Sequence, residues 1–501
     1  MRKMFIALAL VLMMVVAACG GSKTDNNASS PPPSGSSPQA SGGSQSPADG
    51  EPVTITMVAK DWEGDPLTPR LLQAIEEGMK AEGKNVKIEL VPVQSGTYSE
   101  KLGLLLQSGT IPDLIYFQGG DYQFAITQKI LEDLTPYVEK STYLKDSLNP
   151  FNLERLKNYP YLVWPSPTQT AVPVARQDLF DKTASGKALL EDPTIDNYYN
   201  FFKELKEKAG VKYAYTVPGG LEEIDTAFNQ AFGVTSTWIK GDDGKYAYSG
   251  TTSFQKDKLE FYAKLYKDGL LDPEWLTKKW DTKEKAFYDG ESGVIAGRQG
   301  KVIDIYNTKS ISQNGAGAGV IPLPPAKGKA QGYTAIDVSK ESRGWAIAST
   351  SKNKDMAFAI LDYMASPKGL MLDHLGVEGE EYTIEGDKIK LTDQFTAWWA
   401  HFIESPMNLK PDKEIDPARP YMAETAFKSM DMVDAMSTKD NAFVIPAELA
   451  AKWDAAVALE KEFAANYVTG KMKDADFAKF VDAWNAAGGK DVTEYANQTL
   501  K

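Results

Sequence analysis

Short apolar runs alternate with longer amphipathic stretches between residues 53 and 117. Residues 53–59, 86–92 and 113–117 are rich in β-branched side chains and predict three strands. Residues 68–82 and 98–107 lie between these runs and predict helices. Strands that alternate with helices of this length indicate a parallel or mixed sheet with helices on both faces. The sequence therefore predicts an α/β fold.

Polar side chains follow two of the predicted strands. Lys60, Asp61 and Trp62 come after the first strand, and the run from Gln118 to Asp121 comes after the third. In open α/β sheets the ligand crevice lies beyond the carboxyl ends of the strands. We therefore expect Asp61, Trp62, Gln118 and Asp121 to lie near a ligand. The alternative for each polar residue is an ordinary role in capping or solvating a loop.

The composition excludes several classes of function. The 501 residues are enough for more than one domain, and the formal net charge of −13 repels a phosphate backbone, which argues against a nucleic-acid partner. Only two histidines, His374 and His401, and one cysteine, Cys19, are present. These leave little for a histidine-based triad, a zinc site or a disulfide framework. We expect no catalytic residues, no metal and no cofactor.

The amino terminus predicts export. Arg2 and Lys3 precede an apolar run over residues 4–18, and small residues come directly before Cys19. This pattern is typical of a signal peptide over residues 1–19 that ends in a lipobox. The apolar run is shorter than the roughly 20 residues that a spanning helix needs.

Residues 20–51 are dominated by Ser, Gly, Pro, Asn and Gln. Such a segment cannot bury enough apolar surface to fold, so it predicts a disordered tether.

Several ordered motifs resemble one protein family. The chain is similar to the extracellular solute-binding proteins (family 1) of carbohydrate ABC transporters, and in particular to a lipoprotein branch of Gram-positive bacteria. The resemblance extends over nearly the whole chain from residue 53. It rests on the following motifs: Tyr98-x-x-Lys101-Leu102-x-Leu104-Leu105-Leu106-x-Ser108-Gly109-Thr110-Ile111-Pro112-Asp113-Leu114, Gly119-Gly120, Leu131-x-x-Leu134-Thr135-Pro136-Tyr137, Ala231-Phe232-Gly233-Val234, Gly241-Asp242-Asp243-Gly244-Lys245, Leu265-Tyr266-Lys267-Asp268-Gly269-Leu270-Leu271-Asp272-Pro273 and Gly376-Val377-Glu378-Gly379-x-x-Tyr382-Thr383.

The resemblance implies a type II periplasmic-binding-protein fold, in which two α/β lobes joined by a hinge enclose an interlobe cleft. Residues 171–175 would cross from lobe 1 into lobe 2, and residues 319–323 would return. On this basis we expect lobe 1 to comprise residues 52–170 and 322–377, and lobe 2 to comprise residues 171–321 and 378–501.

The resemblance to bacterial lipoproteins also implies cleavage before Cys19 and lipidation of its sulfur, with palmitate among the expected acyl groups. Two acyl chains anchor a protein stably, whereas one is marginal. We expect a protein anchored in the cell membrane by its lipid, on the extracytoplasmic face.

Sugar binding requires flat apolar faces and convergent polar groups. Five tryptophans fall in predicted loops or strand ends and could stack on sugar rings, although each could equally fill the core: Trp62, Trp164, Trp238, Trp280 and Trp345. Of these we take Trp62, Trp238 and Trp345 as candidate ligand contacts. Arg176 and Arg298 follow predicted strands, and together they would favour an acidic sugar such as a uronate. Either arginine could instead form a surface ion pair.

The predicted function is that of a binding lipoprotein of an ABC importer. It would capture an oligosaccharide, including one that contains uronate, and deliver it to permease subunits that have a separate ATPase. We expect a monomer. Two alternatives stay open: a secreted glycoside hydrolase, for which Glu222, Glu223 and Asp225 are candidate carboxylates, and a sensory or adhesive sugar-binding lipoprotein without transport. Peptides or other solutes could also replace the sugar.

Overall fold

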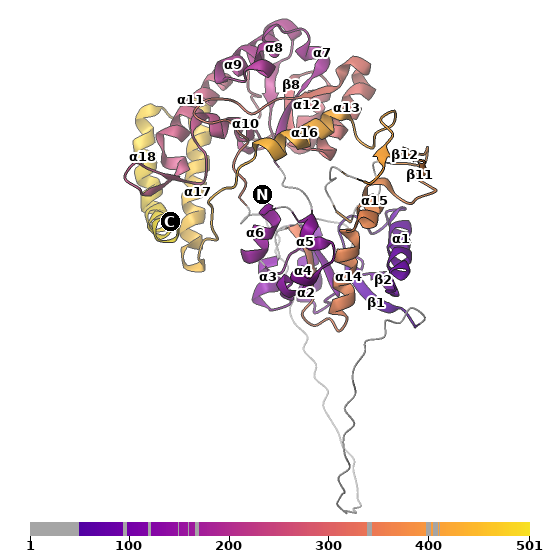
Figure 1. The fold of residues 1–501 in the computed structure, drawn as a ribbon. Helices are drawn as coiled ribbons and strands as arrows, with labels where there is room; N and C mark the ends of the chain where they lie inside the picture. The colour runs from indigo at the N-terminus through magenta and orange to yellow at the C-terminus, as the bar shows by residue number, and fades with distance from the viewer. Residues whose placement is uncertain are drawn as a thin grey trace, which may run out of the picture. The chain divides into compact units, whose positions relative to one another are not determined.

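The computed structural model describes residues 50–93, 98–118, 122–148, 150–158, 160–165, 170–337, 343–396, 402–403, 409 and 411–500. These lie within one compact unit, Pro47–Lys501 (Figure 1). The signal peptide, Cys19, most of the predicted tether and Asp121 lie outside the described residues. No helix in the described part of the chain combines the length and the apolar character needed to span a bilayer.

The first lobe is built on a four-stranded sheet of order β10-β3-β1-β2. Its strands are β1 (Val53–Val58), β2 (Val86–Leu90), β3 (Leu114–Gln118) and β10 (Arg343–Ile347). β1 runs parallel to both β2 and β3, and β10 runs antiparallel to β3. The predicted mixed sheet is confirmed.

The helices of this lobe pack an apolar stripe on the sheet. In α1 (Thr68–Ala81), Leu71, Ile75 and Met79 are fully buried at a spacing of four residues, which keeps them on one helical face. They join Ile55 and Met57 of β1 in one core. The predicted helix over residues 98–107 is α2 (Tyr98–Gln107). The other helices that follow in this lobe are α3 (Tyr122–Thr127), α4 (Thr135–Lys140), α5 (Leu144–Ser147), α6 (Pro150–Asn158), α14 (Lys354–Met364) and α15 (Pro367–Leu375).

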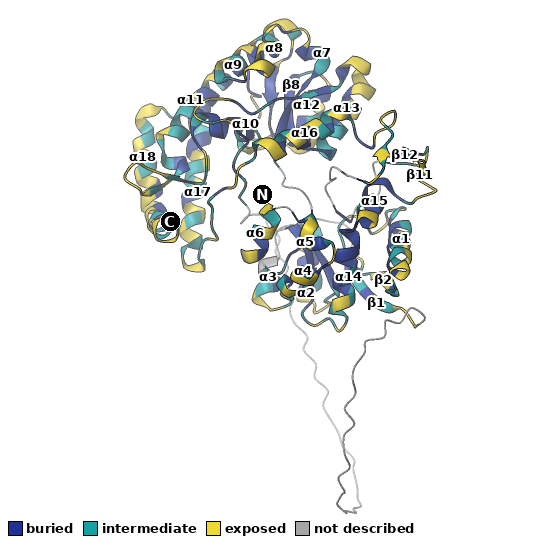
Figure 2. Ribbon diagram, in the orientation of Figure 1, coloured by how far each residue is buried: buried dark blue, intermediate teal, exposed yellow. Residues whose placement is uncertain are grey.

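The second lobe has its own sheet, of order β5-β8-β4-β9. The strands are β4 (Ala171–Arg176), β5 (Tyr213–Thr216), β8 (Ser292–Arg298) and β9 (Val320–Pro322). β5 and β8 are parallel, and β4 is antiparallel to both β8 and β9. The helices of this lobe are α7 (Gln177–Phe180), α8 (Ser185–Glu191), α9 (Ile195–Glu204), α10 (Glu222–Phe232), α11 (Ser253–Lys267), α12 (Trp280–Tyr288) and α13 (Lys301–Asn314). Figure 2 shows buried strands within helices whose outer faces are exposed.

The chain stays with the second lobe well past β9. Ala326 donates its backbone N–H to Ala227, Thr334 donates to Thr226, and Ile336 donates to Thr438. The first strand to rejoin the sheet of lobe 1 is β10, which begins at Arg343. The structure therefore places the return later than residue 322, because backbone hydrogen bonds hold the intervening segment to α10 and to the residues after α16 (Glu424–Met436).

The remaining chain forms two smaller groups. Strands β11 (Tyr382–Glu385), β12 (Lys388–Leu391) and β13 (Glu414–Ile415) make a small sheet that packs on α15 and α16. Helices α17 (Ala447–Val468), α18 (Asp474–Trp484) and α19 (Lys490–Thr499) extend the core of the second lobe. They also cover the hairpin of β6 (Trp238–Lys240) and β7 (Tyr246–Tyr248), whose strands pair antiparallel on either side of the turn at Asp242-Asp243-Gly244.

Candidate functional site

The carboxyl edge of the first sheet displays polar side chains. Gln118 ends β3 and pairs with Arg343 at the start of β10, so these two residues share this edge with the segment that follows β1. In that segment Asp61 adopts a left-handed backbone conformation, with φ of 61°. Its side chain is 80% exposed, and one carboxylate oxygen lies 3.3 Å from the ammonium of Lys60. Left-handed conformations of residues other than glycine cluster at binding sites, where the strain is held in place by the surrounding fold.

A cluster of buried aromatic rings lies next to this edge of the sheet. Trp62, Tyr116, Trp164, Trp345 and Phe402 form an aromatic cluster in which every ring is buried. Trp345 stacks on Phe402 with a centroid distance of 4.4 Å and donates its indole N–H to the Phe402 carbonyl at 3.1 Å. Trp62 lies 6.1 Å from Trp345 and 6.0 Å from Phe402. The structure therefore brings Trp62 and Trp345 together, but Trp345 is only 1% exposed and acts as support rather than as an open surface.

Tyr98 connects the edge to the aromatic cluster. Its hydroxyl donates to the Tyr116 carbonyl at 2.6 Å. Burial, together with the nearby carboxylate of Asp61, raises the pKa of the Tyr98 hydroxyl, so it remains a neutral donor.

Arg343 is an edge residue that sequence reasoning missed. Its guanidinium carbon lies 5.8 Å from the ring centroid of Trp164, and only 8% of the residue is exposed. Arg155 holds the Arg343 carbonyl with a hydrogen bond of 2.7 Å. The signal was its place two residues before Trp345, but only the pairing with β3 shows that this position lies opposite Gln118.

Arg176 and Arg298 lie at opposite ends of the second sheet. β4 runs antiparallel to β8, and Arg298 at the end of β8 pairs with Ala171 at the start of β4. Arg176 is five residues further along β4, which is roughly 17 Å at the rise of an extended strand. The two arginines therefore cannot chelate one carboxylate together, which corrects the paired role expected from the sequence.

The contacts of Arg176 are internal to the lobe. Its guanidinium donates to both carboxylate oxygens of Asp178, at 2.7 and 3.0 Å, and to the carbonyls of Phe287 and Tyr288. Only 6% of the residue is exposed. These bonds tie the end of β4 to α12.

Arg298 is an exposed residue at the carboxyl edge of the second sheet. The next residue, Gln299, is 8% exposed and accepts a hydrogen bond from the Thr170 N–H at 3.0 Å. Gly300 then turns the chain into α13 with φ of 71°, and its N–H donates to Ser429 of α16. Both neighbours are fixed, so the fold holds the backbone that presents Arg298.

Trp280 is a second exposed residue near this edge. It begins α12, and 45% of it is exposed. Its indole N–H donates to Glu284 at 2.7 Å, and the ammonium of Lys283 lies 3.6 Å from the ring centroid. Lys283 also donates to the Ala296 carbonyl of β8, which ties the first turn of α12 to the end of that strand.

Lys283 is fully buried and pairs with Glu223 at 2.8 and 2.9 Å. Burial lowers the pKa of the Lys283 ammonium and raises the pKa of the Glu223 carboxyl. The neighbouring carboxylates also have structural partners, since Asp225 contacts Lys258 at 2.7 Å and Glu222 contacts Lys461 at 3.3 Å. These contacts give the three carboxylates structural roles at the start of α10.

Trp238 lies in a different part of the second lobe. It is 1% exposed and stacks on Phe443 with an interplanar angle of 10°. Tyr248 and Trp453 contact its ring as well. Its ring faces are covered by these side chains, so Trp238 offers no open face to a ligand, and Arg176 is likewise enclosed within the lobe.

No three or more His, Cys, Asp or Glu side chains within the described ranges are grouped so that they could hold a metal ion. The exposed groups at the two edges are instead a carboxylate, a guanidinium and an indole ring. These are groups that bind polar organic solutes through hydrogen bonds and stacking.

Residues 64–371 match the model of the bacterial extracellular solute-binding protein family. The chain belongs to this family. Members of this family bind solutes, and the chain is accordingly a binding protein rather than an enzyme. The glycoside hydrolase alternative is set aside on this ground.

One curated relative is Lipoprotein LipO of Bacillus subtilis (strain 168), which is 24% identical over 353 residues. The match covers 63% of this chain and spans 64% of the length of that relative.

Solved structures share the fold at low sequence identity. The alginate-binding protein AlgQ2 has a TM-score of 0.59 and 18% identity, over 90% of this chain and 98% of its own. The N-glycan transport solute-binding protein NgtS from Streptococcus pneumoniae has a TM-score of 0.63 and 15% identity, and the match covers 89% of this chain and 96% of NgtS. The S. pneumoniae substrate-binding protein FusA, in complex with kestose, has a TM-score of 0.60 and 15% identity, over 90% and 98%. The family membership and these neighbours confirm the two-lobed α/β fold of solute-binding proteins.

Proposed function

We propose that this binding protein captures an oligosaccharide and delivers it to the permease of an ABC importer. The observation that carries the proposal is that the exposed Trp280 and the exposed Arg298 are both held near the carboxyl end of β8, Arg298 as its last residue and Trp280 through Lys283, which bonds the Ala296 carbonyl. A flat aromatic face can stack on a pyranose ring, and a guanidinium can donate to its hydroxyls. On the first lobe, Asp61 and Gln118 supply hydrogen-bonding groups at the corresponding edge.

The structural neighbours support a sugar as the solute. AlgQ2 is described as alginate-binding, NgtS as an N-glycan transport protein, and FusA was solved with kestose. A further neighbour from Bifidobacterium longum infantis is described as an HMO-binding protein associated with an ABC transporter. An acidic sugar would have to rely on Arg298 without Arg176, because the two lie at opposite edges.

Capture follows from a shift of population. A ligand that contacts the edges of both lobes stabilises the closed arrangement, because only that arrangement makes all the contacts. The permease would then recognise the closed form, and a separate ATPase would drive release. The protein would act as a monomer anchored through a lipid on Cys19, on the extracytoplasmic face of the membrane.

Titration calorimetry on Trp280→Ala and Arg298→Ala tests the site. The ligands are kestose, Man1GlcNAc and an alginate-derived tetrasaccharide. We expect each variant to bind the responding sugar about tenfold more weakly, because a stacking or guanidinium contact is lost. Both variants should stay folded because both side chains are exposed, although Trp280→Ala should lower the free energy of unfolding by about 1 kcal/mol, since it loses the contacts with Glu284 and Lys283.

Leu276→Ala is the matched control, because Leu276 is 43% exposed shortly before α12 and has no assigned contact with ligand. Unchanged affinity in both site variants would overturn the proposed site. A response only to peptides would overturn the choice of sugar. Binding without any loss of labelled-sugar uptake in a deletion strain would favour the sensory or adhesive alternative.

A further inference from the structure

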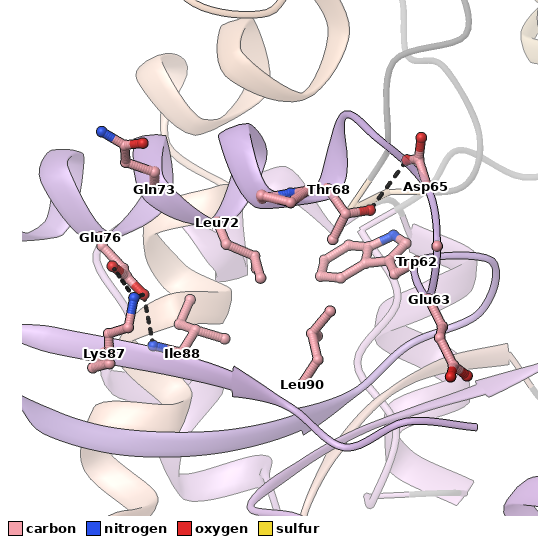
Figure 3. Close-up of a pocket in the computed structure, with 12 residues that line it drawn as sticks. Trp62, Glu63, Asp65, Thr68, Leu72, Gln73, Glu76, Lys87, Ile88 and Leu90 are labelled. Atoms are coloured by element: carbon pink, nitrogen blue, oxygen red, sulfur yellow. Dashed lines mark hydrogen bonds and ion pairs between the residues drawn. The ribbon is translucent and has the colours of Figure 1, made fainter. Parts of the chain in front are cut away.

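A cavity opens on the first lobe, between α1 and β2 (Figure 3). Its volume is about 620 Å³, within the usual range for small-molecule sites. The apolar part of its lining comes from Trp62, Leu72, Ile88 and Leu90. Glu63 and Gln73 are exposed residues at its rim.

The walls of the cavity are held by hydrogen bonds. β2 is an edge strand of the sheet, and its Ile88 N–H donates outward to the Glu76 carboxylate of α1 at 2.8 Å. The other Glu76 oxygen accepts from Lys87 at 3.2 Å. Asp65 accepts from the Leu67 N–H and the Thr68 hydroxyl at the start of α1. Because α1 and β2 are joined in this way, the space between them is built into the fold.

Trp62 connects this cavity to the carboxyl edge of the first sheet. The ring lines the cavity and also contacts Trp345 and Phe402 of the aromatic cluster. Asp61, the exposed residue of the edge, is its neighbour in the chain. The segment that follows β1 therefore contributes one residue to the edge and the next residue to the cavity.

The charge of the lining is unbalanced. Three carboxylates, Glu63, Asp65 and Glu76, face one cation, Lys87. Like charges repel at short range, so this lining disfavours a negatively charged group. The combination of an apolar floor and a polar rim fits the face and the hydroxyls of an uncharged sugar ring.

We propose that the cavity between α1 and β2 is an additional subsite, which holds uncharged pyranose or furanose units of a ligand that extends beyond the carboxyl edge of the first sheet. The inference rests on the proposed function and deepens it, because it assigns a length and a charge to the sugar. Longer neutral oligosaccharides bind more tightly than shorter ones, and a uronate unit at this end weakens binding.

The length dependence is tested by filling the cavity. Leu72→Trp places a large ring inside it, and Gln73→Trp does so from the exposed rim, where the fold tolerates the change. The probes are two pairs of short and long sugars, kestose with fructo-nystose and Man1GlcNAc with Man5GlcNAc. We expect wild type to bind the longer sugar of each pair more tightly. In both variants the affinity for the longer sugar should fall about tenfold, whereas the affinity for the shorter sugar should fall less than about twofold.

Leu104→Trp is the matched control, because Leu104 is 65% exposed on α2 and does not line the cavity. It should retain the preference of wild type for the longer sugar. If no sugar binds to wild type, the proposed function is overturned, and the subsite with it. If sugars bind with the same ratio of long to short in wild type and in both variants, the subsite alone is overturned.

The charge preference is tested with Glu63→Gln, which removes one rim carboxylate without changing its size. We expect wild type to bind an alginate-derived tetrasaccharide more weakly than fructo-nystose. In the variant, the ratio of the two dissociation constants should fall about threefold. Glu139→Gln, an exposed change on α4, should leave the gap unchanged. Equal or tighter binding of the tetrauronate by wild type would overturn the preference for uncharged units.

Discussion

Asp373 and His374 are neighbours in α15 whose side chains are both buried, and burial affects them in opposite senses. Burial raises the pKa of the Asp373 carboxyl to about 7, although it accepts hydrogen bonds from the N–H groups of Phe402 and Ile403. Burial lowers the pKa of the His374 imidazole to about 4. Both groups are therefore neutral in the folded protein near pH 5.5. Through its hydrogen bonds, Asp373 also fixes the backbone of Phe402, which belongs to the aromatic cluster.

The two shifts make opposite contributions to stability. The folded pKa of Asp373 is above its unfolded value of about 3.9, so its contribution is present below pH 4 and is lost as the pH rises to about 7. The folded pKa of His374 is below its unfolded value of about 6.5, so its contribution is present above pH 6.5 and is lost as the pH falls to about 4. In wild type the two contributions to the pH dependence of the unfolding free energy therefore nearly cancel between pH 4.5 and 6.5.

Asp373→Asn should leave the pH dependence contributed by His374 without the opposing contribution. We expect the free energy of unfolding of this variant to rise with pH between 4.5 and 6.5, by about 1.4 kcal/mol per pH unit relative to wild type. His374→Gln should show a fall of similar size over the same range. Urea unfolding at several pH values measures both slopes. Asp355→Asn, at an exposed position in the first turn of α14, should follow wild type. Parallel profiles for all four proteins would contradict the assignment.

At the scale of elements, α12 is fixed to the second sheet by one buried ion pair. Lys283 reaches Glu223 of α10 and the Ala296 carbonyl of β8, so three elements meet at one ammonium. Trp280 lies on the same turn of α12, with its ring over this ammonium. The position of the exposed indole thus depends on a contact made inside the lobe.

Lys283→Met should destabilise the protein strongly. Removing the cation leaves Glu223 buried without its partner, and breaking such a pair costs about 3 kcal/mol or more. The double variant with Glu223→Gln should recover at least about 1 kcal/mol, because no charge is then left behind. Chemical denaturation gives the values.

Lys285→Met supplies the comparison on the same helix. Lys285 is 72% exposed in its side chain and pairs with Asp289, so its loss should leave the free energy of unfolding nearly unchanged. Equal losses for Lys283→Met and Lys285→Met would show that the buried pair does not hold α12.

At the scale of the whole molecule, the folded lobes and the first 49 residues carry different parts of the function. The lobes are proposed to supply the binding surfaces, and the segment that contains Cys19 is proposed to supply the anchor. The proposed anchor rests on the apolar run over residues 4–18 and the small residues directly before Cys19.

Cys19→Ser should release the protein from the membrane. Lipidation requires the cysteine sulfur, so the variant carries no acyl chains. Stable anchoring by lipid needs two acyl chains or one chain with a second membrane-binding signal. We expect the variant to move to the soluble fraction and to lose labelling by a palmitate analogue, with sugar affinity unchanged. Ser22→Ala, three residues further on, should stay in the membrane fraction and keep its label. Membrane retention of Cys19→Ser in spheroplasts would contradict the lipid anchor.

Periodicity predicted most of the elements that carry the first edge. The strand before Asp61 and the helices α1 and α2 follow from side chains a few residues apart, because burial of one face imposes a local repeat. The family motifs predicted the two-lobed fold, which the family membership confirms.

The sequence by itself determined the export pattern, the α/β class and the position of Asp61 and Gln118 at strand ends. Only the tertiary structure decided which tryptophan is exposed and which arginines share an edge. Trp238 and Trp345 are buried by residues distant in the chain, whereas Trp280 is left open at the start of its helix. Arg176 and Arg298 are separated because β4 runs antiparallel to β8. A local pattern encodes which face of an element is buried, but strand direction and the identity of the covering side chains arise from contacts between segments far apart in sequence.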